Sequence, residues 1–171
     1  SEGPVFFINS SISNALSVDL KVEGYGDRTG ALYLMNTTVY TLSTYSAALN
    51  NSGVLLLFNS SINMSKVDIK DGASRVEVFS PISFQVWDIN GTEAASSDVQ
   101  ILNSKGSYVY ESFGIENGAD DWIMLHRKTV FKDEVYEDNP FEFYFNDGNH
   151  YGRMETSVNG ACHLGLHVEN E

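Results

Sequence analysis

Six asparagines stand in the pattern Asn-x-Ser/Thr, the acceptor pattern for N-linked glycans. All six precede residue 93, so the pattern is confined to the first half of the chain. Such a glycan is bulky, needs a side chain that faces water and belongs to exported proteins. The sequence therefore predicts an extracellular or cell-surface protein that carries covalent glycans on one or more of Asn9, Asn36, Asn50, Asn59, Asn63 and Asn90.

Two acidic turns form a second group of candidate ligands. The runs "DINGTE" and "ENGADD" each gather several side-chain oxygens around a glycine. Calcium takes its ligands from carboxylate and carbonyl oxygens, and loops of this kind supply them. Neither run matches an EF-hand loop, and turns of a β-sandwich are also acidic simply because they are solvated. The sequence leaves open a calcium site, the one cofactor that it suggests, built from Asp88, Asn90, Glu93, Glu116, Asp120 and Asp121.

Cys162 is the one cysteine of the chain, which excludes an internal disulfide framework and a multi-cysteine zinc site. It opens the run "CHLGLHVE", whose alternation predicts a strand with Cys162 on the apolar face. His163 and His167 then lie roughly 13 Å apart on the polar face, too far to share a metal. A Cys-His catalytic pair fails because adjacent strand residues point to opposite faces. We expect no enzyme, and expect Cys162 either to pack as a small apolar side chain or to form an intermolecular disulfide.

The run "PVFFI" near the N-terminus is a candidate for self-association. Burying a large apolar side chain is worth about 1.5–3 kcal/mol, so we expect Val5, Phe6, Phe7 and Ile8 to be covered. The run can form an edge strand of its own subunit, or it can complete the sheet of a neighbouring subunit. The second arrangement propagates head to tail into a homopolymer.

The elements that position these residues begin with an internal repeat. The runs "FFINSSI", "YLMNTTV" and "LLFNSSI" align without a gap and place Asn9, Asn36 and Asn59 at spacings of 27 and 23 residues. A period in this range predicts one solenoid coil per repeat, in which a strand runs into an asparagine corner. Asparagine suits a corner because it tolerates left-handed backbone angles and its amide can bond to neighbouring coils. Three similar hairpin strands are the alternative.

The second half reads as further short strands separated by Asn-Gly and Asp-Gly turns, which is typical of an antiparallel sandwich. Residues 1–81 have a net charge of −2 and residues 82–171 a net charge of −11. We predict an all-β chain with a repeat-bearing solenoid-like or sheet part over residues 1–81 and an acidic Ig-like sandwich over residues 82–171. A single jelly-roll-like sandwich is the alternative. The total charge of −13 argues against a nucleic-acid partner, and the apolar runs are too short for a transmembrane helix.

Aromatic residues are frequent in the second half, and they allow two interpretations. An exposed row of them would bind sugar, whereas a buried row fills the core of a sandwich. The residues concerned are Tyr108, Tyr110, Trp122, Phe141, Phe143, Tyr144 and Phe145.

The asparagine corners and the run "FQVWDINGTEAASSDVQILNSKGSYVYESF" resemble prokaryotic, archaeal-type cell-surface proteins. Such proteins combine asparagine-rich β-helix coils with Ig-like or carboxypeptidase-regulatory-like sandwiches. The resemblance implies a structural subunit of an extracellular surface layer, sheath or filament, joined by β-strand pairing. The alternatives are a carbohydrate-binding or adhesive module, and a non-catalytic fragment of a β-helix carbohydrate-active enzyme. With three coils, the first half is short for a free-standing β-helix.

Overall fold

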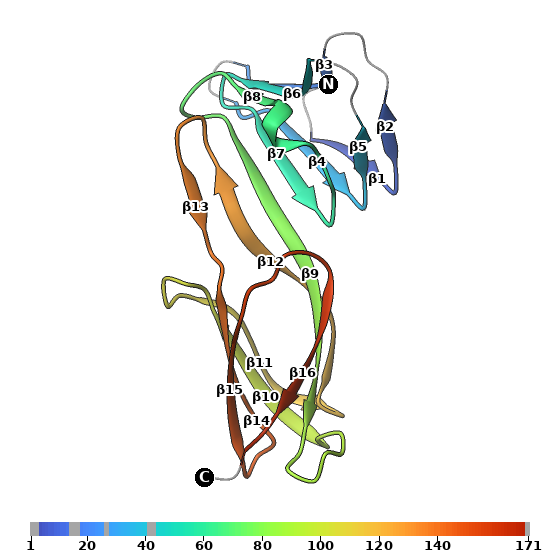
Figure 1. Cartoon of the computed structure of the whole chain (residues 1–171), viewed down its shortest axis with the longest axis vertical. Coiled ribbons are helices and arrows are strands. Elements are labelled where there is room, and N and C mark those ends of the chain that lie inside the picture. Colours follow the sequence, from blue (N-terminus) through green and yellow to red (C-terminus); the bar gives the residue numbers. More distant parts are fainter. Residues whose placement is uncertain (1–3, 14–17, 26–27, 41–43, 170–171) are drawn as a thin grey trace. The chain divides into compact units, whose positions relative to one another are not determined.

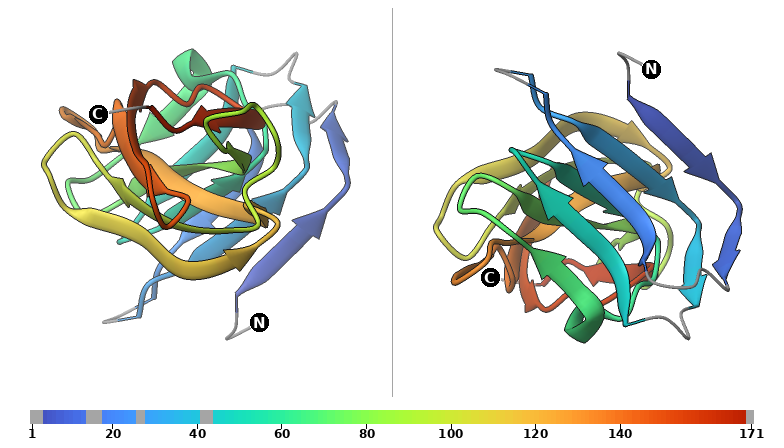
Figure 2. Two further views of the ribbon diagram at one scale, coloured as in Figure 1. Left: turned by 90° about the horizontal axis from the view of Figure 1, so that it is seen from below. Right: turned by 90° about the horizontal axis from the view of Figure 1, so that it is seen from above.

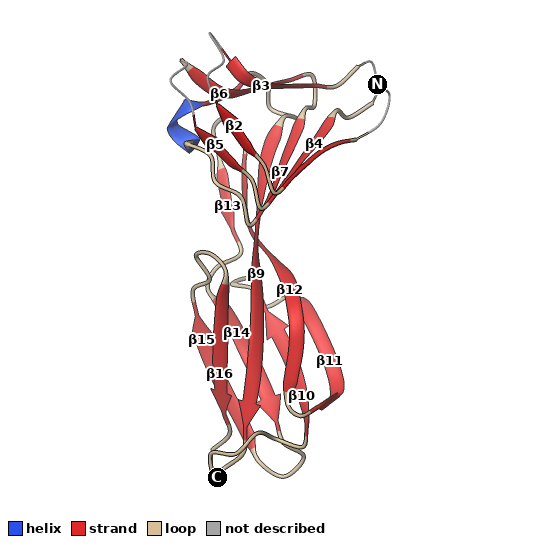
Figure 3. Cartoon of the chain, turned by 90° about the vertical axis from the view of Figure 1, so that its right-hand side faces the viewer, coloured by secondary structure: helices blue, strands red, loops and turns tan. Residues whose placement is uncertain are grey.

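The computed structural model describes residues 4–13, 18–25, 28–40 and 44–169, and for residues 18, 19 and 121 only the backbone. The regular elements in these ranges are β-strands, apart from one 3-10 turn over Met64–Lys66 (Figure 3). The prediction of an all-β chain is confirmed. The chain forms two compact units, which we call the solenoid unit (Ser1–Phe79 with Lys128–Tyr136) and the sandwich unit (Ser80–Arg127 with Glu137–Glu171).

The solenoid unit consists of three coils whose strands stack in parallel (Figure 1). The first coil comprises β1 (Val5–Ile8), β2 (Ser11–Ser13) and β3 (Val18–Glu23). The second comprises β4 (Ala31–Met35), β5 (Thr38–Tyr40) and β6 (Tyr45–Asn50), and the third β7 (Val54–Phe58), the 3-10 turn and β8 (Val67–Ile69). β9 (Arg75–Trp87) follows and pairs with β7 over Arg75–Phe79.

The register of these strands reproduces the sequence repeat. Phe7 pairs with Leu34, 27 residues on, and Leu34 pairs with Leu57, 23 residues on. Every pair between coils is parallel, whereas hairpin strands would be antiparallel. The solenoid interpretation of the repeat is therefore confirmed, and the hairpin alternative is wrong.

Alternate residues of each coil point inward and form the core of the solenoid unit. In the ladder from β4 to β9 the inward-facing positions Leu32 and Leu34, Leu55 and Leu57, and Val76 and Val78 are all buried. Leu20, Val22, Val39, Ala47, Leu49 and Ile69 close the core from the other two ladders. Each large side chain that is fully buried here stabilises the unit by about 1.5–3 kcal/mol before entropy is counted.

The sandwich unit contains an antiparallel sheet of order β11-β10-β14-β15. Its strands are β10 (Ser96–Leu102), β11 (Tyr108–Glu116), β14 (Phe141–Asn146) and β15 (Tyr151–Thr156). The other layer contains the second part of β9, β12 (Ala119–Val130) and β16 (Cys162–His167) (Figure 3). β16 runs parallel to β9, so this layer is mixed rather than antiparallel.

The core of the sandwich unit lies between these two layers. Phe84 of β9, Leu166 of β16 and Phe143 of β14 are fully buried and belong to one apolar cluster. β14 alternates strictly, so that it turns Phe141, Phe143 and Phe145 inward and the residues between them outward.

β9 contributes to both units and passes through Pro81 without a break. Its pairing with β7 ends at Phe79, and its pairing with β16 begins at Ile82. Pro81 lies between these two ladders, and β9 also pairs with β12. The segment Lys128–Tyr136, which includes most of β13 (Val135–Glu137), also belongs to the solenoid unit. The predicted division into residues 1–81 and 82–171 assigns this segment to the sandwich instead.

Candidate functional site

The three repeat asparagines form a stacked corner on the solenoid unit. Asn9, Asn36 and Asn59 directly follow β1, β4 and β7 and have φ angles of 49°, 48° and 46°. This left-handed backbone conformation is one that asparagine adopts more readily than most residues. Asn59 Nδ2 donates a hydrogen bond of 2.9 Å to Oδ1 of Asn36 in the coil before it. The corner geometry and the bond between coils agree with the expectation from the sequence.

The hydroxyl residues after the corner also join the coils. Thr37 is buried, and its Oγ1 donates toward the carbonyl oxygens of Met35 at 2.9 Å and of Phe7 in the first coil at 3.2 Å. The backbone N–H of Thr37 donates in turn to Ser60 Oγ of the third coil at 2.9 Å. The Asn-hydroxyl-hydroxyl pattern is therefore a structural device, because it satisfies backbone groups where the strand ladder is interrupted.

The first coil has an uncovered side. Among the described residues, β1 and β3 each stand at the end of their sheet, and β2 pairs only with β5. Val5 and Phe7 occupy the inward register positions of β1 but are 43% and 37% exposed, whereas their partners Leu32 and Leu34 are 6% and 0% exposed. The right-hand view of Figure 2 shows β1, in dark blue, at the outer side of the parallel strands. At β1 the first coil thus leaves inward-facing apolar side chains partly exposed.

The third coil is covered by a later part of the chain. Val130 packs against the solenoid core, and residues 130–133 lie beside Met64, Val67 and Ile69 around an open cavity of about 430 Å³. Within the described residues, the two ends of the solenoid core therefore differ. Val130 packs against one of them, and the other ends at β1.

The outer edge of β1 has backbone groups that point away from the chain. The N–H of Asn9 donates to Met35 O at 2.9 Å, and the carbonyl oxygen of Phe7 faces Thr37 Oγ1, so the odd-numbered residues face the second coil. In a parallel ladder successive residues point their N–H and C=O to opposite sides. The N–H groups of Phe6 and Ile8 therefore point to the open edge. An edge of this kind is a template for pairing with another strand.

The six predicted glycan acceptors lie in different settings. Asn9, Asn36 and Asn59 are exposed corner residues, and Asn90 is exposed in the loop after β9. Asn63 caps the 3-10 turn, with its Oδ1 accepting from Ser65 N at 3.1 Å and from Ser65 Oγ at 2.8 Å. Asn50 is half-buried, with its Nδ2 3.5 Å from Glu23 Oε1.

The predicted calcium ligands lie in the loop after β9 and around the turn between β11 and β12. Both carboxylate oxygens of Asp88 accept hydrogen bonds from its own loop, from Asn90 N, Thr92 N and Thr92 Oγ1 at 2.8–2.9 Å. These bonds hold the pKa of Asp88 below its ordinary value. Asp120 accepts from the Tyr110 hydroxyl, and burial together with this bond raises the pKa of Tyr110 to about 12.

No group of three or more Asp, Glu, His or Cys side chains lies close enough to hold a metal ion within the described part of the chain. The side chain of Asp121, a further predicted ligand, lies outside that part. Glu93 and Glu116 are exposed.

The strand with the cysteine has the predicted alternation. Cys162 is half-buried against the sandwich core, with Leu164 and Leu166 on the same face. His163 and His167 are both exposed; His163 Nδ1 lies 2.9 Å from Ser83 Oγ, and the ring of His167 stacks on Trp87.

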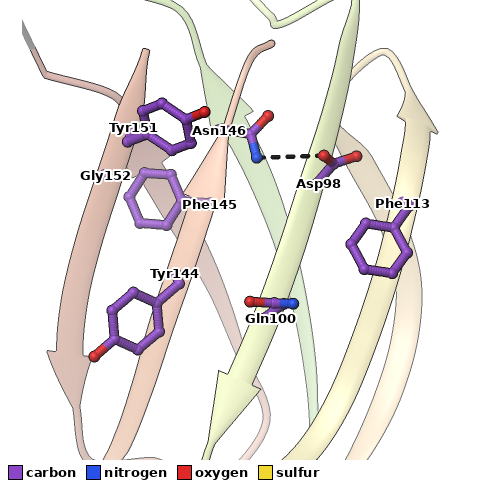
Figure 4. A pocket seen from close by; sticks show the side chains of 8 residues that line it. All are labelled: Asp98, Gln100, Phe113, Tyr144, Phe145, Asn146, Tyr151 and Gly152. Atoms are coloured by element: carbon purple, nitrogen blue, oxygen red, sulfur yellow. Dashed lines mark hydrogen bonds between the residues drawn. The ribbon is translucent and has the colours of Figure 1, made fainter. Parts of the chain in front are cut away.

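The aromatic residues of the second half divide between the two roles that the sequence left open. Phe141, Phe143 and Phe145 are core residues, whereas Tyr108, Trp122 and Tyr144 are exposed. Tyr144 lines a cavity of about 270 Å³ on the outer face of the β11-β10-β14-β15 sheet (Figure 4). Sequence reasoning missed the other side chains of this cavity, namely Asp98, Gln100, Phe113, Asn146 and Tyr151.

No protein-family model matches the sequence, and no curated protein shows significant similarity to it. No helix within the described residues has the length and apolar character to cross a membrane.

Proposed function

We propose that this chain is a structural subunit of an extracellular assembly, such as a surface layer, sheath or filament, and that copies associate by β-strand pairing at β1. The observation that carries this proposal is the uncovered first coil. Its edge offers outward N–H groups at Phe6 and Ile8, and its side chains Val5 and Phe7 are partly exposed. A neighbouring copy that pairs there gains main-chain hydrogen bonds and covers apolar surface in one step.

The construction of both units supports a structural role. Hydroxyl and amide side chains fasten the coils to one another, and the described carboxylates and histidines form no metal cluster. Solenoids need their ends closed by a cap or by a partner, because an end coil cannot cover its own interior. A second copy supplies that closure at the β1 end.

Export and glycosylation belong to the same proposal. Asn63 and Asn90 are suitable acceptors, because both are exposed and both lie outside the stacked asparagine corner. A glycan on Asn59 replaces one of the two hydrogens of the Nδ2 group that donates to Asn36. Intact-mass and glycopeptide mass spectrometry of protein from the native source should find whole glycan units, on Asn63 and Asn90 in the first place. An unmodified mass would remove the support for export.

A proline on the open edge tests the association. Ile8→Pro removes an N–H that points outward, so it spares the pairing with β4 while blocking the addition of a strand. Ile8→Ala is the matched control, since it shortens the same side chain and keeps the N–H. Light scattering and negative-stain microscopy of residues 1–171 should show assembly for the wild type. The protein concentration at which half of the chains have assembled should rise about tenfold or more for Ile8→Pro, and clearly less for Ile8→Ala.

Deletion of residues 1–9 extends the test to the whole strand. We expect a folded β protein that no longer assembles. Assembly that survives both the deletion and Ile8→Pro would refute pairing at β1.

A further inference from the structure

The outer face of the β11-β10-β14-β15 sheet carries a mixture of rings and fixed polar groups that the packing of the sandwich does not use. Phe113 and Tyr151 are 63% and 62% exposed, although large aromatic side chains gain most from burial. Figure 4 shows Asp98, Gln100 and Asn146 in the middle of the cavity, with Tyr144 and Tyr151 on one side and Phe113 on the other. The four strands each contribute at least one side chain.

A β-bulge places Phe113 in this arrangement. The pairs Ser97–Ile115 and Val99–Ser112 leave Phe113 and Gly114 opposite Asp98 alone. Gly114 has a φ of 65°, and its N–H donates to Asp98 Oδ1 at 2.9 Å. Bulges re-aim a side chain where regular pairing would not, and they are frequent beside functional sites. Here the bulge turns an aromatic ring outward and fixes a carboxylate beside it.

The polar side chains are held in place and retain free bonding capacity. Asp98 Oδ2 accepts from Asn146 Nδ2 at 3.3 Å, and Asn146 Oδ1 accepts from Gly148 N at 3.0 Å. Gln100 Nε2 donates to Glu111 Oε1 at 2.6 Å, which leaves its own Oε1 as an acceptor. A carboxylate has about four lone-pair sites, and an amide nitrogen has two hydrogens. Asp98, Gln100 and Asn146 can each make at least one further hydrogen bond.

The charge of the cavity selects the class of ligand. None of its lining residues is Lys or Arg, and Asp98 is its one charged group. A phosphate, a sulfate or an acidic sugar would meet this carboxylate, and the guanidinium of Arg153, 5.6 Å from the Tyr144 ring, is already paired with Glu142. A neutral sugar ring offers apolar C–H faces to the aromatic rings and hydroxyl groups to carboxylate and amide side chains. Phe113 lies on β11 and Tyr151 on β15, and these strands are separated by three inter-strand spacings, or roughly 14 Å. This distance suits a chain of several sugar units better than a single sugar ring.

We propose that the outer face of the β11-β10-β14-β15 sheet binds a neutral saccharide chain, which lies across Phe113, Tyr144 and Tyr151 and donates and accepts hydrogen bonds at Asp98, Gln100 and Asn146. This site is separate from β1, so it gives the proposed subunit a second contact, directed at a glycan. Binding at this face does not depend on self-association.

An array of neutral and anionic polysaccharides, followed by titration calorimetry with each that binds, tests this site on residues 1–171. We expect binding to one or more neutral glycans such as mannan, cellulose or chitin oligosaccharides, with little dependence on NaCl. Phe113→Ala and Tyr151→Ala should each weaken it about tenfold or more. Tyr108→Ala is the matched control, because Tyr108 is 64% exposed on the same sheet but does not line the cavity, and it should leave the affinity unchanged.

Three results would overturn the proposal. They are the absence of binding to every neutral saccharide, an equal loss of binding in Tyr108→Ala, and a stronger response to a quaternary ammonium compound or a peptide than to any sugar. The Ile8→Pro variant should bind the saccharide as the wild type does, so failure of the self-association proposal and failure of this one are distinguishable.

Discussion

Asn59 donates its side-chain amide to the side-chain carbonyl of Asn36 at 2.9 Å, across 23 residues of sequence and one step of the solenoid. Both residues have a left-handed backbone, so each asparagine fills two roles at once. It permits the turn, and it joins its coil to the next. The two roles can be separated by substitution.

Asn59→Gly removes the bond between coils but keeps the turn, whereas Asn59→Ala removes the bond and strains the turn. We expect Asn59→Gly to lower the free energy of unfolding of the solenoid unit by about 1 kcal/mol. Asn59→Ala should lower it by about 1–2 kcal/mol more. Both tryptophans, Trp87 and Trp122, lie in the sandwich unit, so amide hydrogen exchange on β4 and β7 is the suitable measurement for the solenoid unit. Equal effects of the two substitutions would contradict a role for the backbone angle.

Gly152→Ala should destabilise the sandwich unit by overpacking. A Cβ at this position would lie 2.2 Å from Cε2 of the Phe145 ring, which is itself buried. We expect the free energy of unfolding to fall by about 1–3 kcal/mol, as measured by tryptophan fluorescence during unfolding in urea. Gly160→Ala is the control, because a Cβ there meets nothing within 4 Å, and it should change the stability by less than about 0.5 kcal/mol.

Asp138 should contribute to the pH dependence of the sandwich unit. Burial alone would raise the pKa of this carboxyl, but hydrogen bonds from His126 Nδ1 at 2.6 Å and Lys105 Nζ at 3.0 Å bring it below its ordinary value of 3.8. A lowered pKa stabilises the folded state above the unfolded value, and this contribution is lost as the pH falls through the folded value.

Asp138→Asn should therefore lower the free energy of unfolding by about 1–3 kcal/mol near neutral pH. The difference from the wild type should shrink below about pH 4, where the wild-type carboxyl also becomes protonated. Urea titrations across this range measure it, with the exposed Glu116→Gln as control. If the difference in free energy of unfolding between the two proteins stayed constant down to about pH 2, Asp138 would stabilise the fold through packing and not through its charge.

Cys162 should react slowly with alkylating reagents. Burial raises the pKa of its thiol above the ordinary value of 9.0, and only the thiolate is nucleophilic. At about pH 8 we expect alkylation about tenfold or more slower than that of free cysteine, with the full rate restored in denaturant. A fast reaction in the native protein would instead favour the intermolecular disulfide, which a non-reducing gel would detect.

The solenoid could be predicted from the sequence because its signals are local and repeat. Asn9, Asn36 and Asn59 mark equivalent corners, and the residues before each alternate inward and outward, so spacing alone gives the register. The alternation of β16 was predictable for the same reason.

The saccharide-binding face could not be predicted in this way. Asp98, Phe113 and Tyr151 come from three strands, and they converge only through the sheet order and through a bulge at Phe113 and Gly114. Neither feature has a signature in the local sequence. The packing of Val130 against the solenoid core could not be predicted either. In the sequence, residues Ser80–Arg127 of the sandwich unit separate residue 130 from the rest of the solenoid unit.

Val130 packs against one end of the solenoid core and leaves β1 as the open end, and this limits how many copies can join. If two copies join through their β1 edges alone, each uses the same surface, the contact has two-fold symmetry and growth stops at a pair. A filament therefore requires β1 to meet a different surface, and β13, which ends the same sheet on its far side, is an edge of that kind. The particle size in solution distinguishes a closed pair from an open chain of subunits.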